Sequence, residues 1–304
     1  MTTIPTHRPL MSRVAAAPIS WGVCEVPGWG HQLPPTQVLG EMREIGITAT
    51  EFGPDGFLPT DPQNRADSLR SYGLDAVGGF VPAVLHRPDH DPMPTVTAAL
   101  DTFAACGATT LVLAAATGQD GYDSRPALDE SGWQTLFGNL DAITAAASRR
   151  GITATLHPHI GTLVEREDEV LRVLDGSTVP LCLDTGHLLA GGTDPVALAR
   201  HAPDRIAHVH LKDVDSASAR EVRAGRTSYA TAVAEDLYRP LGQGDVDLAA
   251  LIGTLETHGY QGWYVMEQDT VLSGPPAPGQ GPLRDVRASL DHLSQIAHSQ
   301  AVPR

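Results

Sequence analysis

The stretch GITATLHPHIGTLVEREDEVLRVLDGSTVPLCLDTGH (residues 151–187) contains two apolar, β-branched runs separated by a helix-like run. Ile152–His157 and Val179–Asp184 have the composition of short strands, and Glu167–Leu174 has the spacing of a helix. Because strands joined by a helical crossover pair in parallel, this stretch predicts a strand–helix–strand unit of a parallel sheet.

The same alternation recurs along the whole chain. Short apolar runs predict eight strands, at Val14–Trp21, Ile47–Phe52, Asp75–Val81, Thr109–Ala115, Ile152–His157, Val179–Asp184, Ile206–Leu211 and Trp263–Glu267. Helix-like stretches lie between them, at Gln37–Ile45, Thr95–Ala105, Trp133–Arg150, Glu167–Leu174, Pro195–His201 and Leu248–His258. An open doubly wound sheet is the alternative, but neither its glycine-rich turn after the first strand nor a phosphate-binding loop is present. The pattern predicts an α/β fold, a single (β/α)₈ TIM barrel.

One domain is expected to span residues 1–304, since α/β barrels of this length form around one core. Long connections after the strands, which build barrel active sites, are Cys24–Pro35, Gly53–Pro62, Pro82–Pro94, Thr117–Pro126 and Thr270–Pro282. The connection between Val214 and Asp245 is the longest, and its part Ala217–Tyr238 has helical character. It predicts either a lid over the barrel mouth or a surface decoration.

Composition limits the partners. The net charge of −15, with 21 Lys and Arg, argues against nucleic acid. A signal-peptide core and an apolar run long enough to cross a membrane are both missing from the sequence. Its three cysteines, Cys24, Cys106 and Cys182, form no C-x-x-C pair, which fits a reduced, cytoplasmic setting.

Ligand-type side chains gather at the ends of the predicted strands, where a barrel opens into its functional face. They are His157 and His159 in ITATLHPH, Asp184 and His187 in VPLCLDTGH, His210 and Lys212 in IAHVHLKD, and Glu267 in WYVMEQD. An unpaired polar group in a buried strand costs about 1–3 kcal/mol. These side chains are therefore expected to converge on a bound group.

Asp184, His210 and Glu267 form a mixed oxygen and nitrogen set on consecutive strands, which suits Mn²⁺, Co²⁺, Fe²⁺ or Zn²⁺. Each has a simpler explanation, because a strand-end Asp can cap the next helix and a buried His can be a hydrogen-bonded core residue. Their joint occurrence favours one divalent metal ion.

The period of two in HVHLKD places His208, His210 and Lys212 on one side of a strand. His208 lies deepest in the barrel and Lys212 lies nearest its mouth. His208 is then expected to support a ligand from below rather than to bind the metal. By the same period His157 and His159 share a side, and His157 is the expected fourth ligand.

Several motifs resemble the xylose-isomerase-like superfamily of sugar isomerases and epimerases, and within it the myo-inosose (2-keto-myo-inositol) dehydratases. The resemblance covers nearly the whole chain, in APISWG (17–22), TEFGPDGF (50–57), LHPHIGT (156–162), CLDTGH (182–187), HVHLKDV (208–214), PLGQGDVD (240–247) and VMEQD (265–269). It implies a catalytic metal on Asp184, His210 and Glu267. Many members supply a Glu as fourth ligand where this chain has His157, which leaves Glu165 as the alternative. Mn²⁺ or Co²⁺ is the first expectation, with Zn²⁺, Fe²⁺ or Mg²⁺ as alternatives.

The resemblance also implies loss of water from a small polyhydroxylated carbonyl substrate. The metal would polarise the ketone, a base would remove the neighbouring proton, and an acid would protonate the departing hydroxyl. His187, Lys212 and Glu165 are the expected catalytic residues, and His159, Glu51 and Trp21 the expected substrate-binding residues. Each has a structural alternative: His187 could cap a helix, Lys212 could be a surface residue paired with Asp213, and Glu51 and Trp21 could be packing residues. Lys212, if it lies beside a cation, is expected to have a lowered pKa.

Three classes of function remain open from the sequence. The first is a metal-dependent lyase that dehydrates inosose, and the second is an isomerase or epimerase that shares the same proton removal. The third is a carbohydrate-binding barrel without activity, which would show no turnover and bind no metal. A homo-oligomer is expected only by analogy with other barrels of this type.

Overall fold

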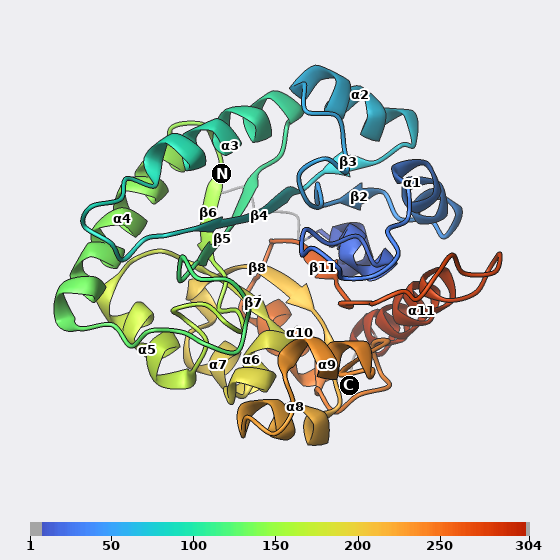
Figure 1. Ribbon diagram of the computed structural model, residues 1–304. Coiled ribbons are helices and arrows are strands. Elements are labelled where there is room, and N and C mark those ends of the chain that lie inside the picture. The colour runs from blue at the N-terminus through green and yellow to red at the C-terminus, as the bar shows by residue number, and fades with distance from the viewer. Residues whose placement is uncertain (1–7, 302–304) are drawn as a thin grey trace, which may run out of the picture.

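Nine parallel strands form one sheet that closes into a barrel (Figure 1). The computed structural model describes residues 8–301. The strands are β1 (Val14–Ala16), β2 (Ala49–Thr50), β3 (Asp75–Ala76), β4 (Gly78–Ala83), β5 (Thr110–Ala115), β6 (Thr153–Leu156), β7 (Leu181–Asp184), β8 (Ile206–Leu211) and β11 (Tyr264–Met266), in the order β3-β2-β1-β11-β8-β7-β6-β5-β4.

The two ends of this order are parts of one interrupted strand. β3 and β4 flank Val77 and together correspond to the predicted strand Asp75–Val81, so β3 pairs with β2 while β4 pairs with β5. The Phe52 amide also donates to the Gly78 carbonyl (3.0 Å), which joins the end of β2 to β4. A Cβ on Gly78 would lie 2.0 Å from the Thr110 carbonyl oxygen, so only glycine permits this approach. The predicted eight-unit barrel is confirmed.

Helices surround the strands (Figure 1). They are α1 (Pro35–Glu44), α2 (Pro62–Ser71), α3 (Met93–Cys106), α4 (Glu130–Ser148), α5 (Glu167–Gly176), α6 (Thr185–Gly191), α7 (Pro195–His201), α10 (Leu248–Thr257) and α11 (Pro282–Ala301). The six helices predicted with bounds are present close to them, α2 and α11 complete the eight predicted strand–helix repeats, and α6 was not predicted. Within residues 8–301, none of the helices has the length and apolarity needed to cross a membrane.

The first predicted strand is shorter than expected. β1 ends at Ala16, and Pro18–Trp21 forms a 3₁₀ helix (η2), so the prediction of a strand over Val14–Trp21 is corrected. Proline has no N–H for a sheet ladder, and its fixed φ suits the first turn of a helix. Trp21 therefore does not occupy a strand end.

The long connection after β8 folds into four short elements, β9 (Asp213–Val214), α8 (Ser216–Arg223), α9 (Tyr229–Ala234) and β10 (Tyr238–Arg239). The stretch predicted as helical is thus two helices and a strand, and β10 pairs antiparallel with β9. Tyr229, Tyr238 and Ala190 of α6 lie in one hydrophobic cluster, which holds the connection against α6. The lid itself stays a prediction.

Asp213, at the start of the connection after β8, holds the last part of that connection through hydrogen bonds. Its buried carboxylate accepts hydrogen bonds from the amides of Gly242 (2.8 Å), Gly244 (2.9 Å), Val246 (3.0 Å) and Val214 (3.0 Å). These bonds join the motif HVHLKDV to the motif PLGQGDVD in the fold. Asp213 acts on the backbone, and Lys212 is buried rather than a surface partner of Asp213.

Candidate active site

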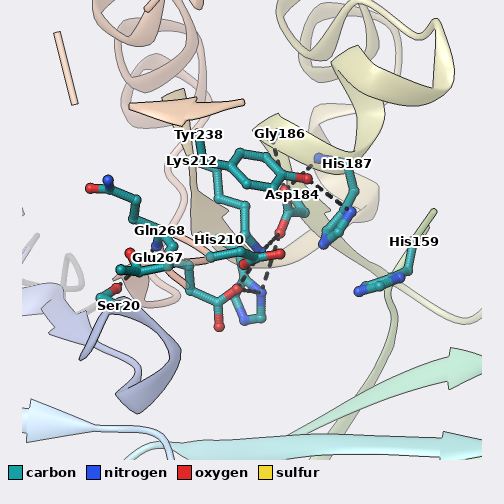
Figure 2. Close-up of polar contacts among 12 residues, drawn as sticks. Ser20, His159, Asp184, Gly186, His187, His210, Lys212, Tyr238, Glu267 and Gln268 are labelled. Atoms are coloured by element: carbon teal, nitrogen blue, oxygen red, sulfur yellow. Dashed lines mark hydrogen bonds and ion pairs between the residues drawn. The ribbon is translucent and has the colours of Figure 1, made fainter. Parts of the chain in front are cut away.

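The predicted metal ligands meet at the ends of three adjacent strands. Asp184 is the register partner of His210, and Met266 is the partner of Leu211, so Glu267 follows directly beside them. One ligand atom each from Asp184, His210 and Glu267 lies within 4.8 Å of the others, and all three side chains are buried. Figure 2 shows the three side chains pointing toward one another.

Asp184 performs two tasks with its two oxygens. Oδ1 caps α6 by accepting the amides of Gly186 and His187, both at 2.8 Å. Oδ2 faces the other side, 3.2 Å from His157 Nε2 and 2.8 Å from Lys212 Nζ. The capping explanation and the ligand explanation for this residue are therefore compatible.

Glu51 fixes the orientation of His210 from below. Its Oε1 lies 2.8 Å from His208 Nε2 and 3.0 Å from His210 Nε2. Burial alone would raise the pKa of the Glu51 carboxyl, but the charge of His210 and the hydrogen bond with His208 hold it below its usual range. Glu51 thus accepts hydrogen bonds from histidines, which is a positioning arrangement. It also lines the cavity at this end of the barrel, and its predicted contact with substrate hydroxyls stays a prediction.

The other nitrogen of His210 fits a metal ligand. His210 Nδ1 finds no hydrogen-bond partner among residues 8–301, yet it lies 3.1 Å from Glu267 Oε2 and 3.6 Å from Asp184 Oδ2. A metal-binding histidine usually donates its second ring N–H to a carboxylate, as His210 does to Glu51. The donor set of two carboxylates and an imidazole suits a divalent first-row cation.

Lys212 lies among carboxylates, and the lowered pKa expected for it beside a bound cation stays a prediction. Nζ is 2.8 Å from Asp184 Oδ2, 2.6 Å from Glu267 Oε2 and 3.3 Å from Asp269 Oδ1. Burial alone would lower the pKa of the ammonium, but these carboxylates raise it well above its usual value. Lys212 is accordingly a charged donor at the edge of the ligand set.

Two further histidines are held neutral beside the ligands. The rings of His159 and His187 lie with their centroids 3.7 Å apart and their planes tilted by 33°, and both line the cavity. Burial lowers the pKa of His159 to about 3, helped by His157 and Lys212. It also lowers the pKa of His187 far below its usual value, again with help from His159 and Lys212. At neutral pH both imidazoles are therefore uncharged, whereas Lys212 carries a positive charge.

A cavity of about 720 Å³ opens at this end of the barrel. His157, His159, His187, His210, Lys212 and Glu267 line one wall, and the aromatic lining consists of Trp29, Phe52, Phe80, Phe103 and Tyr122. Trp21 is fully buried behind it, and its indole Nε1 donates to Glu41 Oε2 (2.7 Å). Trp21 is thus a packing residue, which corrects its predicted role in substrate binding.

Glu165 is directed away from the ligand set. Its Oε2 accepts the Gly161 amide (2.7 Å) and lies 3.4 Å from Arg125 Nε. This pairing leaves His157, which contacts Asp184, as the better placed fourth donor. The structure therefore corrects the predicted catalytic and alternative ligand roles of Glu165.

Three polar residues beside the site were not predicted. They are Asp269, Tyr229 and Tyr238, all buried. Asp269 could have been found from VMEQD, because the period of two places it on the same side as Glu267. The tyrosines lie in the long connection after β8, for which the sequence indicated helical character but not which side chains turn toward the site.

Substituting His208 by Gln should weaken metal binding without abolishing it. The change perturbs the Glu51 carboxylate that orients His210, and loss of such a supporting contact typically costs about 10–100-fold in affinity. Glu51→Gln should act in the same direction. Competition with a chelator measures the affinity, and complete metal loss from a folded His208→Gln protein would mean that His208 is itself a ligand.

Comparison with known proteins agrees with this arrangement. The model of the xylose isomerase-like TIM barrel family matches residues 39–296. The chain is 31% identical over 278 residues to an inosose dehydratase of Geobacillus kaustophilus (strain HTA426), covering 86% of this chain and 90% of that protein. It is 33% identical over 275 residues to the rhizopine catabolism protein MocC of Rhizobium meliloti, covering 86% and 82%. A crystal structure of IOLI protein with a binding zinc atom has a TM-score of 0.70 at 14% identity, covering 96% of this chain and 100% of that one. The chain belongs to the xylose isomerase-like TIM barrel family, as its strand-end motifs predicted.

Proposed function

We propose that this protein is a metal-dependent dehydratase that removes water from 2-keto-myo-inositol or a close keto-cyclitol. The observation that carries the proposal is the meeting of Asp184, His210 and Glu267 beside neutral His187 and charged Lys212, at one end of the barrel. The likeness to an inosose dehydratase over most of the chain supports the choice of substrate class.

Asp184, His210 and Glu267 would hold the metal ion, with His157 as the fourth ligand. His157 Nε2 already lies 3.2 Å from Asp184 Oδ2, and its Nδ1 has no hydrogen-bond partner in the described part of the chain. When bound, the ion would supply positive charge beside the ketone oxygen and so favour loss of a neighbouring proton. The zinc bound by the similarly folded IOLI protein supports a divalent ion, and Mn²⁺ or Co²⁺ remains our first choice.

His187 and Lys212 divide the two proton transfers. The neutral imidazole of His187 takes the proton from the carbon next to the ketone, and the electron pair remains on the substrate. The ammonium of Lys212 gives a proton to the β-hydroxyl as its C–O bond breaks, so that water leaves. The resulting enol rearranges to a dione.

The remaining cavity wall binds the ring. His159 packs against the ring of His187 and lines the cavity, where it can hold a substrate hydroxyl. Trp29, Phe80 and Tyr122 offer faces for the C–H side of a cyclitol, the role first expected for Trp21.

Incubation with 2-keto-myo-inositol tests this function. Metal-loaded protein should produce an ultraviolet-absorbing dione, chelation should stop the reaction, and Mn²⁺ or Co²⁺ should restore it. Tyr260→Phe serves as the control, because the Tyr260 hydroxyl donates a hydrogen bond to the Trp263 carbonyl outside the site. Its turnover should be unchanged. Metal binding without any product would contradict the proposed reaction.

A further inference from the structure

A chain of hydrogen bonds runs from Asp269 to His187 through two tyrosines. Tyr229 Oη donates to Asp269 Oδ2 (2.8 Å), and the hydroxyls of Tyr229 and Tyr238 are 3.1 Å apart. Tyr238 Oη lies 3.4 Å from His187 Nδ1. Figure 2 shows the Tyr238 hydroxyl reaching the His187 ring above Asp184.

Each of the two tyrosine hydroxyls has one proton to donate, and this sets the direction of every hydrogen bond between Asp269 and His187. Tyr229 Oη donates its proton to Asp269 Oδ2, and the other oxygen of Asp269 lies 3.3 Å from Lys212 Nζ. Tyr229 has then no proton left for Tyr238 and must accept one from it. Tyr238 in turn must accept from His187 Nδ1–H.

We propose that Asp269, Tyr229 and Tyr238 are positioning residues that hold His187 in the tautomer with its proton on Nδ1. His187 Nε2 then carries a free lone pair. This nitrogen is the one that finds no hydrogen-bond partner within residues 8–301, on a ring that lines the cavity. The inference rests on the proposed function in one respect, that this lone pair takes the substrate proton.

The surroundings of the two tyrosines support this direction. Tyr229 and Tyr238 are 1% and 2% exposed, so bulk water does not compete for their protons. Burial, reinforced by Asp269, raises the pKa of both hydroxyls well above its usual value, which keeps both protonated.

The local sequence allows Tyr238 to approach His187. A Cβ on Gly186 would lie 2.6 Å from Lys212 Cβ and 2.7 Å from Tyr238 Cε1, so the glycine of DTGH leaves room for both side chains. Tyr238 is placed by the pairing of β10 with β9, and Tyr229 by α9. The connection after β8 thus supplies part of the proton-transfer machinery, whether or not it moves as a lid.

The proton balance follows directly. The substrate C–H proton passes to Nε2, the electron pair stays on the substrate, and the imidazolium keeps its Nδ1–H bond to Tyr238. With the opposite tautomer, Nε2 would carry a proton and could not accept one. Breaking this series of hydrogen bonds should therefore reduce turnover and leave substrate binding unchanged.

The tautomer can be measured without substrate. Zinc-loaded, ¹⁵N-histidine-labelled protein gives long-range ¹H–¹⁵N spectra that show which ring nitrogen carries the proton, and His187→Asn identifies the signals of His187. We expect Nδ1–H in the parent. In Tyr229→Phe the Tyr238 proton loses its acceptor and turns to His187 Nδ1, so the histidine proton should move to Nε2.

Kinetics provide the second readout. Tyr229→Phe and Tyr238→Phe should keep their metal and KM but lose at least about tenfold in kcat, since they impair a general base worth about 10²–10⁴-fold. Tyr260→Phe, which also removes one buried hydroxyl, should change neither the tautomer nor kcat.

A parent protein with the His187 proton on Nε2 would overturn the inference, and this result needs no variant to fold. An unchanged tautomer in a folded Tyr229→Phe protein would also overturn it. Failure of the proposed function looks different: 2-keto-myo-inositol would not react, while the tautomer would still respond to Tyr229→Phe.

Discussion

Asp184→Asn and His210→Ala should each yield folded protein without its divalent ion and without measurable dehydration. Each change removes one of three donors that lie within 4.8 Å of one another, and the charge lost from Asp184 cannot be replaced by an amide. Asn keeps an oxygen for the Gly186 and His187 amides, so the cap of α6 should survive. Elemental analysis of purified, dialysed protein measures the ion, with about one per chain expected in the parent.

Asp194→Ala is the matched control for this experiment. Asp194 caps α7 through the Val196 and Ala197 amides in the same way that Asp184 caps α6. Its loss should cost about 0.5–2 kcal/mol of stability and leave the metal in place. Full metal retention in both site variants would show that the ligands have been misassigned.

His187→Ala and Lys212→Ala should retain the metal and lose turnover. Neither residue belongs to the proposed ligand set, but one accepts and the other donates a proton, and such transfers contribute about 10²–10⁴-fold. We expect at least about a hundredfold loss in one of the two. Atomic analysis of the metal and steady-state assays on the same preparations separate binding from chemistry.

Exchange of the substrate α-proton in D₂O separates the two roles. Lys212→Ala should still exchange the proton without expelling water, because its base is intact, whereas His187→Ala should do neither. A smaller loss of turnover in both variants would mean that His159 carries out the proton transfer. Dehydration at the parent rate in both would refute the mechanism even if the metal site were correct.

The alternation of strands and helices was enough to predict the barrel. A parallel sheet needs helical crossovers, and that requirement is visible in the spacing of apolar runs such as Ile152–His157 and Val179–Asp184. The bounds of α2 were not predicted, because only Leu69 in it is buried, which leaves no apolar stripe. By contrast α11 has buried residues at Leu283, Val286, Leu293 and Ile296, a helical spacing that was present in the sequence.

The site was predictable where it depends on strand ends and unpredictable where it depends on loops. Asp184, His210 and Glu267 converge because neighbouring parallel strands end together. Trp21 and Glu165 were misplaced because a 3₁₀ turn and an arginine pair, respectively, direct them elsewhere. The sequence also could not predict that three carboxylates meet around the Lys212 ammonium, because Asp184, Glu267 and Asp269 come together only in the folded chain.

Several expectations from the sequence remain predictions. They are the cytoplasmic location, the absence of a nucleic-acid partner, the homo-oligomer and the lid formed by the connection between Val214 and Asp245. Proteolysis of the metal-loaded protein with and without substrate would test the lid, since closure should protect the exposed turn around Gly225.

Mass spectrometry of the product formed from 2-keto-myo-inositol tests the central claim most directly. The metal-loaded protein should convert the substrate to a compound lighter by one molecule of water, and Asp184→Asn should not. Recovery of a compound of unchanged mass but altered stereochemistry would instead show that the proton returns to the substrate and that no hydroxyl leaves. That result would contradict dehydration and identify the protein as an epimerase.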